Sequence, residues 1–469
     1  MVVGEVAEGV DLLVVGGGPG GYAAALRAAQ LGREVILVDR GGAAGLGGAC
    51  LHVGCIPSKA LIELAEVVHR ARTMEVAGVT SASIGADLAR FQPWKDSAVE
   101  KLRAGIETLL RRNKVRVLSG ELAFNRPNRA AVATPDGNVT FLEFASAIVA
   151  TGSRPAGLRG FPFDGDRVLD SAQVLALDGV PPTMAIIGAG YIGLELGTAF
   201  AKLGCQVTIV EILETILPEL DAAVTRPVVH SLERLGVRLL LGAEATALGE
   251  HELIVRGAGT EHRVPAAKVV VAVGRLPNTG ELGLASSGVT VRQDGTVPVD
   301  MARLAARNIA AVGDITGGPA LAHKATAEAE VAAEVLSGRR ARFEPAAIPA
   351  VVFADPEVVI VGLSERTARA RGIEAAVAQF PLAASGRAAT LGASDGVVRM
   401  VVDRDSDVVV GVQMAGPHVS ELAGEAALAI EMMASPEDLA ATIHPHPTIS
   451  EGLREAAALL VGRPLHVIG

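Results

Sequence analysis

Residues 11–39 have the sequence DLLVVGGGPGGYAAALRAAQLGREVILVD, and this stretch decides the fold. It divides into a strand, a glycine turn, an alanine-rich helix and a second strand, at 11–15, 16–21, 22–31 and 34–38. The glycines expected to face a nucleotide are Gly16, Gly18 and Gly21. Such glycines let the backbone approach a pyrophosphate, and the helix N-terminus offers N–H groups to that anion. An acid at the end of the second strand, here Asp39, binds the ribose hydroxyls. The stretch therefore predicts a dinucleotide-binding βαβ unit.

A second copy of this arrangement begins at residue 184. Its strand, glycine turn, helix and second strand are expected at 184–187, 188–193, 194–203 and 206–210. The corresponding glycines are Gly188, Gly190 and Gly193. In each copy an acid stands 23 residues after the first glycine, Asp39 in one and Glu211 in the other. Two such copies predict two bound dinucleotides, commonly a flavin and a nicotinamide.

The residues after each acid bear on the choice of nucleotide. Residues 212–214 contain no Arg or Lys to receive a 2′-phosphate, so the second site is expected to prefer NAD over NADP. Asp39 is followed by Arg40, which by itself leaves the nucleotide of the first site open. Glu211 could instead be a surface acid at the end of a strand.

Composition and charge exclude several other classes of protein. The chain has 469 residues, 50% of them hydrophobic, which predicts an α/β protein of several domains. Its 42 basic and 52 acidic residues give a net charge of −10, and this charge repels nucleic acid and anionic lipid. Glycine or a charged residue breaks each apolar run before the roughly 20 residues that a membrane span needs. Three cysteines and no leader pattern predict a cytoplasmic protein without a disulfide scaffold. No metal site is expected.

Further strands are expected outside the two βαβ units. The strands expected to close the two nucleotide-binding sheets lie at 147–150, 269–273 and 309–312. After Gly338 the pattern changes, and strands in a meander-like order are expected at 348–353, 358–361, 396–402 and 408–414. Helices are expected to follow at 421–433 and 450–461.

Cys50 and Cys55 lie in GGACLHVGCIPSK, residues 47–59, directly after the first βαβ unit. In an ideal helix a spacing of five separates the Cα atoms by about 8.6 Å, more than the roughly 4.4–6.8 Å that a disulfide requires. The segment must therefore depart from a helix if the two cysteines pair. Gly54 permits that distortion, and a helix is expected to follow over 58–72. Two separate buried cysteines are the alternative.

Residues 47–59 resemble the redox loop of the flavin-dependent pyridine nucleotide–disulfide oxidoreductases, and within them the members that oxidise dihydrolipoyl groups with NAD. The resemblance covers nearly the whole chain, including both glycine turns and the segments 150–152, 312–314, 321–324, 380–387 and 444–451. It implies an α/β fold with two Rossmann-like domains, for FAD and NAD, and a C-terminal α+β dimerisation domain. The FAD-binding, NAD-binding, central and interface domains are expected at 1–150, 151–275, 276–344 and 345–469. It also implies a homodimer.

The resemblance implies a role for each reactive side chain. Cys50 would exchange with the substrate, Cys55 would contact the flavin, His446 would be the base and Glu451 would orient it. The chemistry agrees, because thiol–disulfide exchange requires a thiolate and a neutral imidazole is well matched to removing a thiol proton near neutral pH. Without the resemblance, a His between two prolines is more often a turn residue.

The same resemblance implies the contacts with the cofactors. Asp314 would hold the ribitol chain, while Lys59 and Glu195 would form an ion pair near the reactive edge of the flavin. The other residues expected at a cofactor are Gly16, Gly18, Gly21, Asp39, Thr151, Gly152, Gly188, Gly190, Gly193, Glu211, Gly274, Leu321, Ala322 and His323. Residues expected to be structural or to support the site are His52, His323, His444 and Cys205, the last as a small buried side chain.

Related enzyme classes fit less well. Glutathione-type reductases usually carry Val-Pro-Lys-Lys after the second cysteine, and this chain does not. A flavin transhydrogenase of this fold lacks the second cysteine. A mercuric reductase needs a C-terminal cysteine pair, and residues 453–469 contain none. The chain departs from the usual family pattern at Asp39, Ala49, His52 and Pro445. The loop 40–48 is also expected to be one residue longer than in many relatives, which affects contacts at the flavin diphosphate.

The expected partners follow from the implied reaction. No lipoyl domain precedes the flavin fold, so the lipoyl group is expected to arrive on another protein, such as the core of a 2-oxoacid dehydrogenase or related complex. An alternative of another class is a docking subunit whose role is assembly, with an acidic surface that meets a basic domain.

Overall fold

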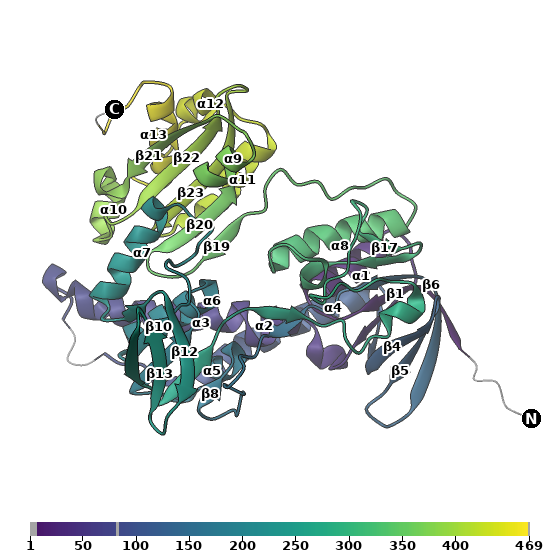
Figure 1. Ribbon diagram of the computed structural model, residues 1–469. Helices are drawn as coiled ribbons and strands as arrows, with labels where there is room; N and C mark the ends of the chain where they lie inside the picture. Colours follow the sequence, from purple (N-terminus) through teal and green to yellow (C-terminus); the bar gives the residue numbers. More distant parts are fainter. Residues whose placement is uncertain (1–6, 81–83, 468–469) are drawn as a thin grey trace, which may run out of the picture. The chain divides into compact units, whose positions relative to one another are not determined.

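The computed structural model describes residues 7–80 and 84–467. The chain forms two compact units, each assembled from separated stretches of sequence (Figure 1). The first unit contains Met1–Ser58, Ala89–Ala156 and Gly274–Glu344, and the second contains Lys59–Leu88, Gly157–Val273 and Pro345–Gly469. The assignment of four domains along the chain stays a prediction.

The first unit is built on a mostly parallel sheet with the strand order β17-β18-β6-β1-β2-β3. The bounds are β1 (Glu8–Val15), β2 (Val35–Asp39), β3 (Arg116–Ser119), β6 (Val139–Val149), β17 (Leu304–Ala306) and β18 (Ile309–Ala311). The expected βαβ unit is confirmed, because α1 (Pro19–Gln30) joins β1 to β2 and Leu13 pairs with both Ile36 and Ala147. The strands expected near 147 and 309 do extend this sheet.

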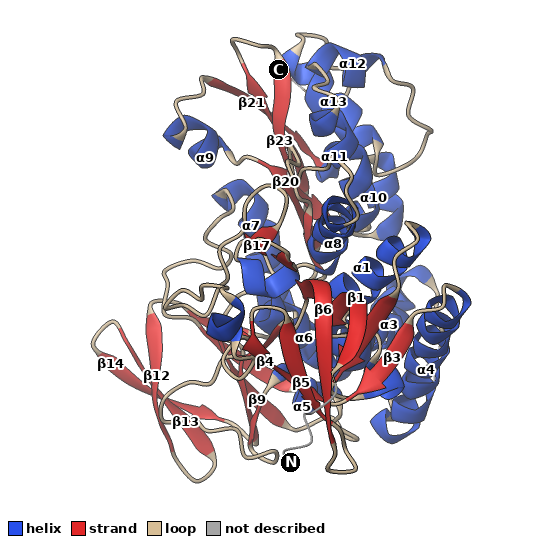
Figure 2. Ribbon diagram, turned by 90° about the vertical axis from the view of Figure 1, so that its right-hand side faces the viewer, coloured by secondary structure: helices blue, strands red, loops and turns tan. Residues whose placement is uncertain are grey.

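Both faces of this sheet are buried, which explains why residues 12–15 of β1 form a continuous apolar run. Leu12 and Val14 pack against the helices α1, α4 (Leu88–Arg112) and α8 (Ala322–Leu336), of which α1 and α8 lie side by side (Figure 2). Leu13 and Val15 pack on the opposite face with β4 (Glu121–Arg126) and β5 (Arg129–Ala133). The other elements of the unit are η1 (Gly42–Gly45), α2 (Gly48–Val53), β7 (Ser153–Pro155), β16 (Arg275–Pro277), η3 (Leu284–Ser287) and η4 (Gly313–Thr316).

The second unit contains a parallel sheet with the order β11-β10-β9-β15-β8. The bounds are β8 (Val168–Leu169), β9 (Thr183–Ile187), β10 (Gln206–Val210), β11 (Arg238–Leu240) and β15 (Lys268–Val271). The second βαβ unit is confirmed, with α6 (Tyr191–Leu203) between β9 and β10. A separate antiparallel sheet, β12 (Ala243–Leu248), β13 (Glu252–Gly257) and β14 (Thr260–Pro265), was not expected. Further helices are α3 (Cys55–Thr73), which begins in the first unit, η2 (Met74–Ala77), α5 (Ser171–Leu175) and α7 (Ala222–Arg234).

The C-terminal part of the second unit is an antiparallel sheet with the order β19-β20-β23-β22-β21. The bounds are β19 (Ala350–Val352), β20 (Glu357–Gly362), β21 (Ala375–Pro381), β22 (Val397–Asp403) and β23 (Val408–Gly416). The expected meander order is wrong. After β20 the chain crosses to the far edge of the sheet and forms β21 there. It then returns through β22, so that β23 pairs with both β22 and β20. The sheet packs on α11 (Ala423–Glu431), α12 (Pro436–Ala441) and α13 (Glu451–Leu460). The helix expected over 421–433 begins with a separate 3₁₀ turn, η6 (Val419–Leu422), and the smaller elements are α9 (Glu365–Ala370), η5 (Leu382–Ala384) and α10 (Gly386–Leu391).

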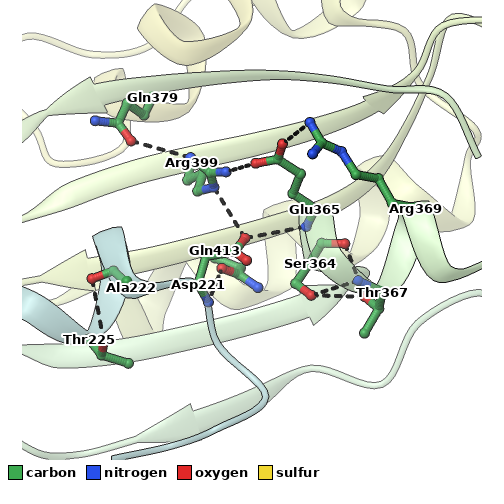
Figure 3. A network of polar contacts seen from close by, with 10 residues as sticks. All are labelled: Asp221, Ala222, Thr225, Ser364, Glu365, Thr367, Arg369, Gln379, Arg399 and Gln413. Atoms are coloured by element: carbon green, nitrogen blue, oxygen red, sulfur yellow. Dashed lines mark hydrogen bonds and ion pairs between the residues drawn. The ribbon is translucent and has the colours of Figure 1, made fainter. Parts of the chain in front are cut away.

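A polar network joins α7 and α9 to this sheet (Figure 3). Asp221, which precedes α7, accepts a hydrogen bond from Arg399 Nε at 3.2 Å and one from the backbone N–H of Glu365 at 3.3 Å. Arg399, on β22, also forms an ion pair with the Glu365 carboxylate, and its side chain is only 13% exposed. One largely buried guanidinium thus pairs with two carboxylates, and this fixes both helices to the sheet.

Candidate functional site

The first glycine turn brings backbone very close to backbone. Gly16 has a φ of +100°, and a Cβ at this position would lie 2.5 Å from the carbonyl oxygen of Ala150. A Cβ on Gly21 would lie 1.7 Å from the carbonyl oxygen of Gly16, so only glycine lets α1 pack this tightly on the turn. Gly18 is the N-cap of α1 and has no side chain to cover the helix N-terminus. This turn can receive an anion at the start of α1.

Asp39 ends β2 beside this turn. Its carboxylate accepts the backbone N–H of Gly17 at 2.7 Å and that of Gly41 at 2.9 Å. The loop after Asp39 folds over the carboxylate as η1, so closely that a Cβ on Gly45 would lie 2.0 Å from Asp39 Oδ1. The short side chain of Asp39 is therefore matched by a glycine-rich loop that approaches it.

The second glycine turn has the same geometry. A Cβ on Gly188 would lie 2.5 Å from the Ala272 carbonyl oxygen, and one on Gly193 would lie 2.0 Å from the Gly188 carbonyl oxygen. Glu211 accepts the N–H groups of Ala189 at 2.7 Å and Leu213 at 2.9 Å, the counterparts of the two bonds to Asp39. The N-caps Gly18 and Gly190 have nearly equal backbone angles, with φ of −68° and −74° and ψ of −176° and −179°. Both turns therefore fit a dinucleotide, and backbone N–H groups fix the orientation of both acids.

The segment with the two cysteines consists of two helices that meet at Gly54. Cys50 lies in α2 and is half-buried, and Cys55 is the first residue of α3 and is exposed. The helix is interrupted between the two cysteines, as their pairing would require, because Gly54 departs from it with φ of −134° and ψ of −109°. A Cβ on Gly54 would lie 2.9 Å from the Ala49 carbonyl oxygen, so a glycine is required at this break. His52 Nε2 contacts the Leu46 carbonyl oxygen at 2.9 Å, which supports its structural role.

Lys59 on α3 and Glu195 on α6 form the expected ion pair, with Nζ and Oε2 2.8 Å apart. The Glu195 side chain is 6% exposed, and its other oxygen accepts the backbone N–H of Phe353 at 3.0 Å. Lys59 Nζ lies 4.5 Å from the centre of the Phe353 ring, within the range of a cation–π interaction. Phe353 thus holds both members of the pair, a contact that the sequence analysis missed.

A second ion pair of reversed polarity joins the same two helices two turns further on. Glu66 lies seven residues after Lys59, and Lys202 lies seven residues after Glu195. Lys202 Nζ contacts Glu66 Oε2 at 2.5 Å and Asp355 Oδ2 at 2.8 Å, with only 7% of its side chain exposed. The two pairs therefore fix α3 and α6 in register, which a single pair would not do.

Asp314, the residue expected at the flavin ribitol, is held by neighbouring elements of the first unit. Asp314 lies in η4 and accepts a hydrogen bond from Ser153 Oγ at 2.5 Å. Ser153 in turn accepts Arg275 Nε at 2.7 Å. Other residues expected at a cofactor lie near these elements in sequence. Thr151 and Gly152 follow β6, Gly274 precedes β16, and residues 321–323 lie at the start of α8. The structure thus holds Asp314 in a defined orientation.

His446 and Glu451 form the expected pair in the second unit. His446 Nδ1 lies 2.9 Å from Glu451 Oε1, and Glu451 Oε2 accepts the backbone N–H of Thr448 at 2.9 Å. Burial raises the pKa of Glu451, but the hydrogen bonds from Thr448 and His446 outweigh it and leave the pKa below its usual value. The carboxylate is therefore ionised at neutral pH and orients the ring through Nδ1, which leaves Nε2 to accept a proton. The His446 side chain is 77% exposed.

His444 lies two residues before His446 and has a different environment. Its side chain is 4% exposed, and its two ring nitrogens contact Glu425 Oε1 at 2.8 Å and the Thr442 carbonyl oxygen at 3.0 Å. The hydrogen bond to Glu425 raises the pKa of His444 above 6.5, with the Thr442 carbonyl adding to it, while burial and Arg454 oppose the rise. Because two acceptors face the ring, the protonated form is favoured.

We therefore expect His444 to make stability depend on pH. Its contribution is fully present below pH 6.5, the value in the unfolded chain, and is lost as pH rises through the higher pKa of the folded protein. The measurement is the urea midpoint between pH 6 and 9 for the unchanged chain and for His444→Gln. The difference between the two midpoints should shrink as pH rises; a difference that grows would contradict the assignment.

The third cysteine, Cys205, is buried as expected, and burial raises the pKa of its thiol to about 12. Such a thiol is unreactive at neutral pH. Among residues 7–80 and 84–467, the structure has no cluster of three His, Cys, Asp or Glu side chains suited to a metal ion. In the same part of the chain no helix is both long and apolar enough to cross a membrane.

Comparisons with known proteins match the whole chain. Residues 10–329 match the family described as pyridine nucleotide-disulphide oxidoreductase, and residues 348–457 match the dimerisation domain of that family. The chain is 44% identical over 473 residues to the dihydrolipoyl dehydrogenase of Geobacillus stearothermophilus and 45% identical over 477 residues to that of Halobacterium salinarum, with full coverage of all three chains. Its structure is similar to that of LpdA from Mycobacterium tuberculosis, with a TM-score of 0.88, 29% identity, and coverage of 96% of this chain and 100% of the other.

Proposed function

The chain belongs to the pyridine nucleotide-disulphide oxidoreductase family, and from this premise we propose that it oxidises protein-bound dihydrolipoyl groups and reduces NAD⁺, with FAD as its bound cofactor. The observation that carries the proposal is the His446–Glu451 pair in a chain that also has the Cys50 and Cys55 motif. A carboxylate-oriented imidazole is a base suited to a thiol substrate. Full-length identity of 44–45% to relatives named dihydrolipoyl dehydrogenase supports the same substrate class.

The proposed chemistry assigns each reacting group to a side chain. His446 takes the proton of one dihydrolipoyl thiol at Nε2, and Glu451 stabilises the imidazolium that forms. The substrate thiolate attacks Cys50 of a Cys50–Cys55 disulfide, so the bond between the two cysteines breaks and Cys55 leaves as thiolate. The second substrate thiol then displaces Cys50, its proton passes to the departing Cys50 sulfur, and the lipoyl disulfide is released. Bound FAD and NAD⁺ supply the two-electron acceptors that return the cysteines to the disulfide.

The two nucleotide turns support the placement of the cofactors. We assign FAD to the first turn, with Asp39 at its ribose and Asp314 at its ribitol, and NAD to the second turn, with Glu211 at its ribose. Backbone N–H groups already orient both ribose-binding acids. Lys59 and Glu195 are assigned to the reactive edge of the flavin, where an ion pair with a buried carboxylate can respond to charge.

The function is tested by purification and turnover. The purified chain should be yellow, should retain FAD through gel filtration, and should reduce NAD⁺ in the presence of dihydrolipoamide. NADP⁺ should be a much poorer acceptor, because Glu211 stands where a 2′-phosphate would need a cation. A chain that binds flavin but transfers no electrons from dihydrolipoamide would instead support the role of a docking subunit.

We also propose a homodimer. The region that matches the dimerisation domain exposes several large apolar side chains, Leu428, Met432, Met433 and Ile443, of which Ile443 is 94% exposed. Exposed apolar groups so close together in sequence are typical of an interface. Ile443 lies three residues from His446, which supports an active site that takes its base from one subunit and its cysteines from the other.

We further propose a cytoplasmic location, which the low cysteine count supports. The proposed partner is the core of a complex that bears lipoyl groups.

Complementation between two inactive variants tests the shared active site. Mixed His446→Gln and Cys50→Ser chains should recover about a quarter of the sites if subunits exchange at random, because half of the dimers are then mixed and each has one intact site. The measurement is dihydrolipoamide-dependent reduction of NAD⁺ after refolding of the mixture. Mixed dimers isolated by two affinity tags that remain inactive would show that each site uses residues of one chain.

A further inference from the structure

A buried charge cluster lies directly behind the turn that carries Asp314. Glu328, on α8, is completely buried, and its carboxylate accepts the backbone N–H of Gly313 at 2.6 Å. Arg303 Nη2 lies 2.7 Å and Lys324 Nζ 3.2 Å from the same carboxylate, and neither cation exposes more than 11% of its side chain. One anion and two cations are thus placed together away from water.

Two side chains of the cluster bind the backbone N–H and the carbonyl oxygen of Gly313. Glu328 takes the N–H of Gly313, and Lys324 donates to its carbonyl oxygen at 3.3 Å and to Thr316 Oγ1 at 3.2 Å. Gly313 has a φ of +79°, in the left-handed region, so the chain turns sharply just before Asp314. Side chains from one helix therefore fix the first and last residues of η4.

We propose that Glu328, with Lys324, is a positioning residue for FAD, because it fixes the turn that presents Asp314 to the ribitol chain. The inference rests on the proposed function. It goes beyond the proposed function because it assigns a role to a completely buried residue. Ser153 holds the Asp314 carboxylate from the side of β7, so the side chain and its backbone are held by different elements.

Stability alone does not account for this arrangement. Apolar residues of similar volume often replace a buried ion pair with little loss of stability, or with a gain. A carboxylate that accepts a backbone N–H, by contrast, fixes one residue in one orientation. The cluster is therefore suited to orienting η4.

The test measures FAD binding to the apoprotein. Glu328→Gln keeps the shape of the side chain but removes its charge, and it should raise the Kd for FAD at least tenfold in a fluorescence titration. Glu330→Gln, an exposed position on the same helix, is the matched control and should leave the Kd unchanged. The melting temperature of each apoprotein shows whether the variant is folded. If Glu328→Gln does not fold, Lys324→Met removes only the contacts of Lys324 and should weaken FAD binding in the same direction.

A double-mutant cycle separates positioning from general destabilisation. If Glu328 acts through Asp314, then adding Glu328→Gln to an Asp314→Asn chain should change the Kd for FAD less than threefold. A full tenfold effect in both backgrounds would overturn the proposal, as would unchanged FAD binding by Glu328→Gln. If the unchanged apoprotein binds no FAD, it is the proposed function that fails, and the two failures are therefore distinguishable.

Discussion

Cys50→Ser is expected to abolish the oxidation of dihydrolipoamide, by at least about 10³-fold, while NADH still reduces the bound FAD. Serine has no sulfur that can exchange with the substrate, but the nucleotide turns do not depend on this side chain. The two half-reactions are measured separately and anaerobically, by following the loss of flavin absorbance after adding either dihydrolipoamide or NADH. Cys205→Ser is the matched control, because the Cys205 thiol is buried and its pKa is raised to about 12.

A labelling experiment tests which of the two cysteine sulfurs meets the substrate. Cys55→Ser should also block the oxidation of dihydrolipoamide, so activity alone does not distinguish the two positions. Limited alkylation of the NADH-reduced protein, followed by peptide mass analysis, should label Cys50 before Cys55 if Cys50 is the sulfur that meets the substrate. Faster labelling of Cys55 would exchange the two assignments.

Those parts of the fold that depend on local patterns were predictable from the sequence. Gly16 and Gly21 lie close in sequence, and each is needed because a Cβ would collide with nearby backbone. Their spacing identifies the turn once the strand before it, the helix after it and the acid 23 residues after Gly16 are counted. The same holds for Asp39 and Glu211, since each accepts the N–H group two residues later in the chain. These features depend on short-range geometry.

Other parts of the fold and the site depend on contacts across long stretches of sequence. No strand was expected at β21. The predicted order of the C-terminal strands was wrong, because sheet order depends on tertiary packing and not on the pattern within a strand. The Lys202 pairs and the Glu328 cluster join residues whose local sequence has no distinctive pattern. Lys59 and Glu195 are 136 residues apart, and only the family resemblance connected them. Phe353, which contacts both, has no signal in the sequence.

His446→Gln is expected to slow the dihydrolipoamide half-reaction by about 10²- to 10⁴-fold, because a glutamine cannot take the thiol proton. Reduction of bound FAD by NADH should keep its rate, since no thiol proton is transferred in that step. Glu451→Gln should slow the dihydrolipoamide half-reaction less, because the ring is still present but loses the carboxylate that stabilises its protonated form.

The pH dependence of the dihydrolipoamide half-reaction distinguishes a base from a structural residue. In the unchanged chain its rate should rise with pH, because a base takes the thiol proton only in its unprotonated form. In His446→Gln that rise should disappear and leave a dependence on the substrate thiol alone, which ionises at higher pH. His251→Gln is the control, because the His251 side chain is 90% exposed and lies in the second unit outside the proposed site. If His446→Gln lowers both half-reactions equally and keeps the pH profile, the residue supports the fold and another group is the base.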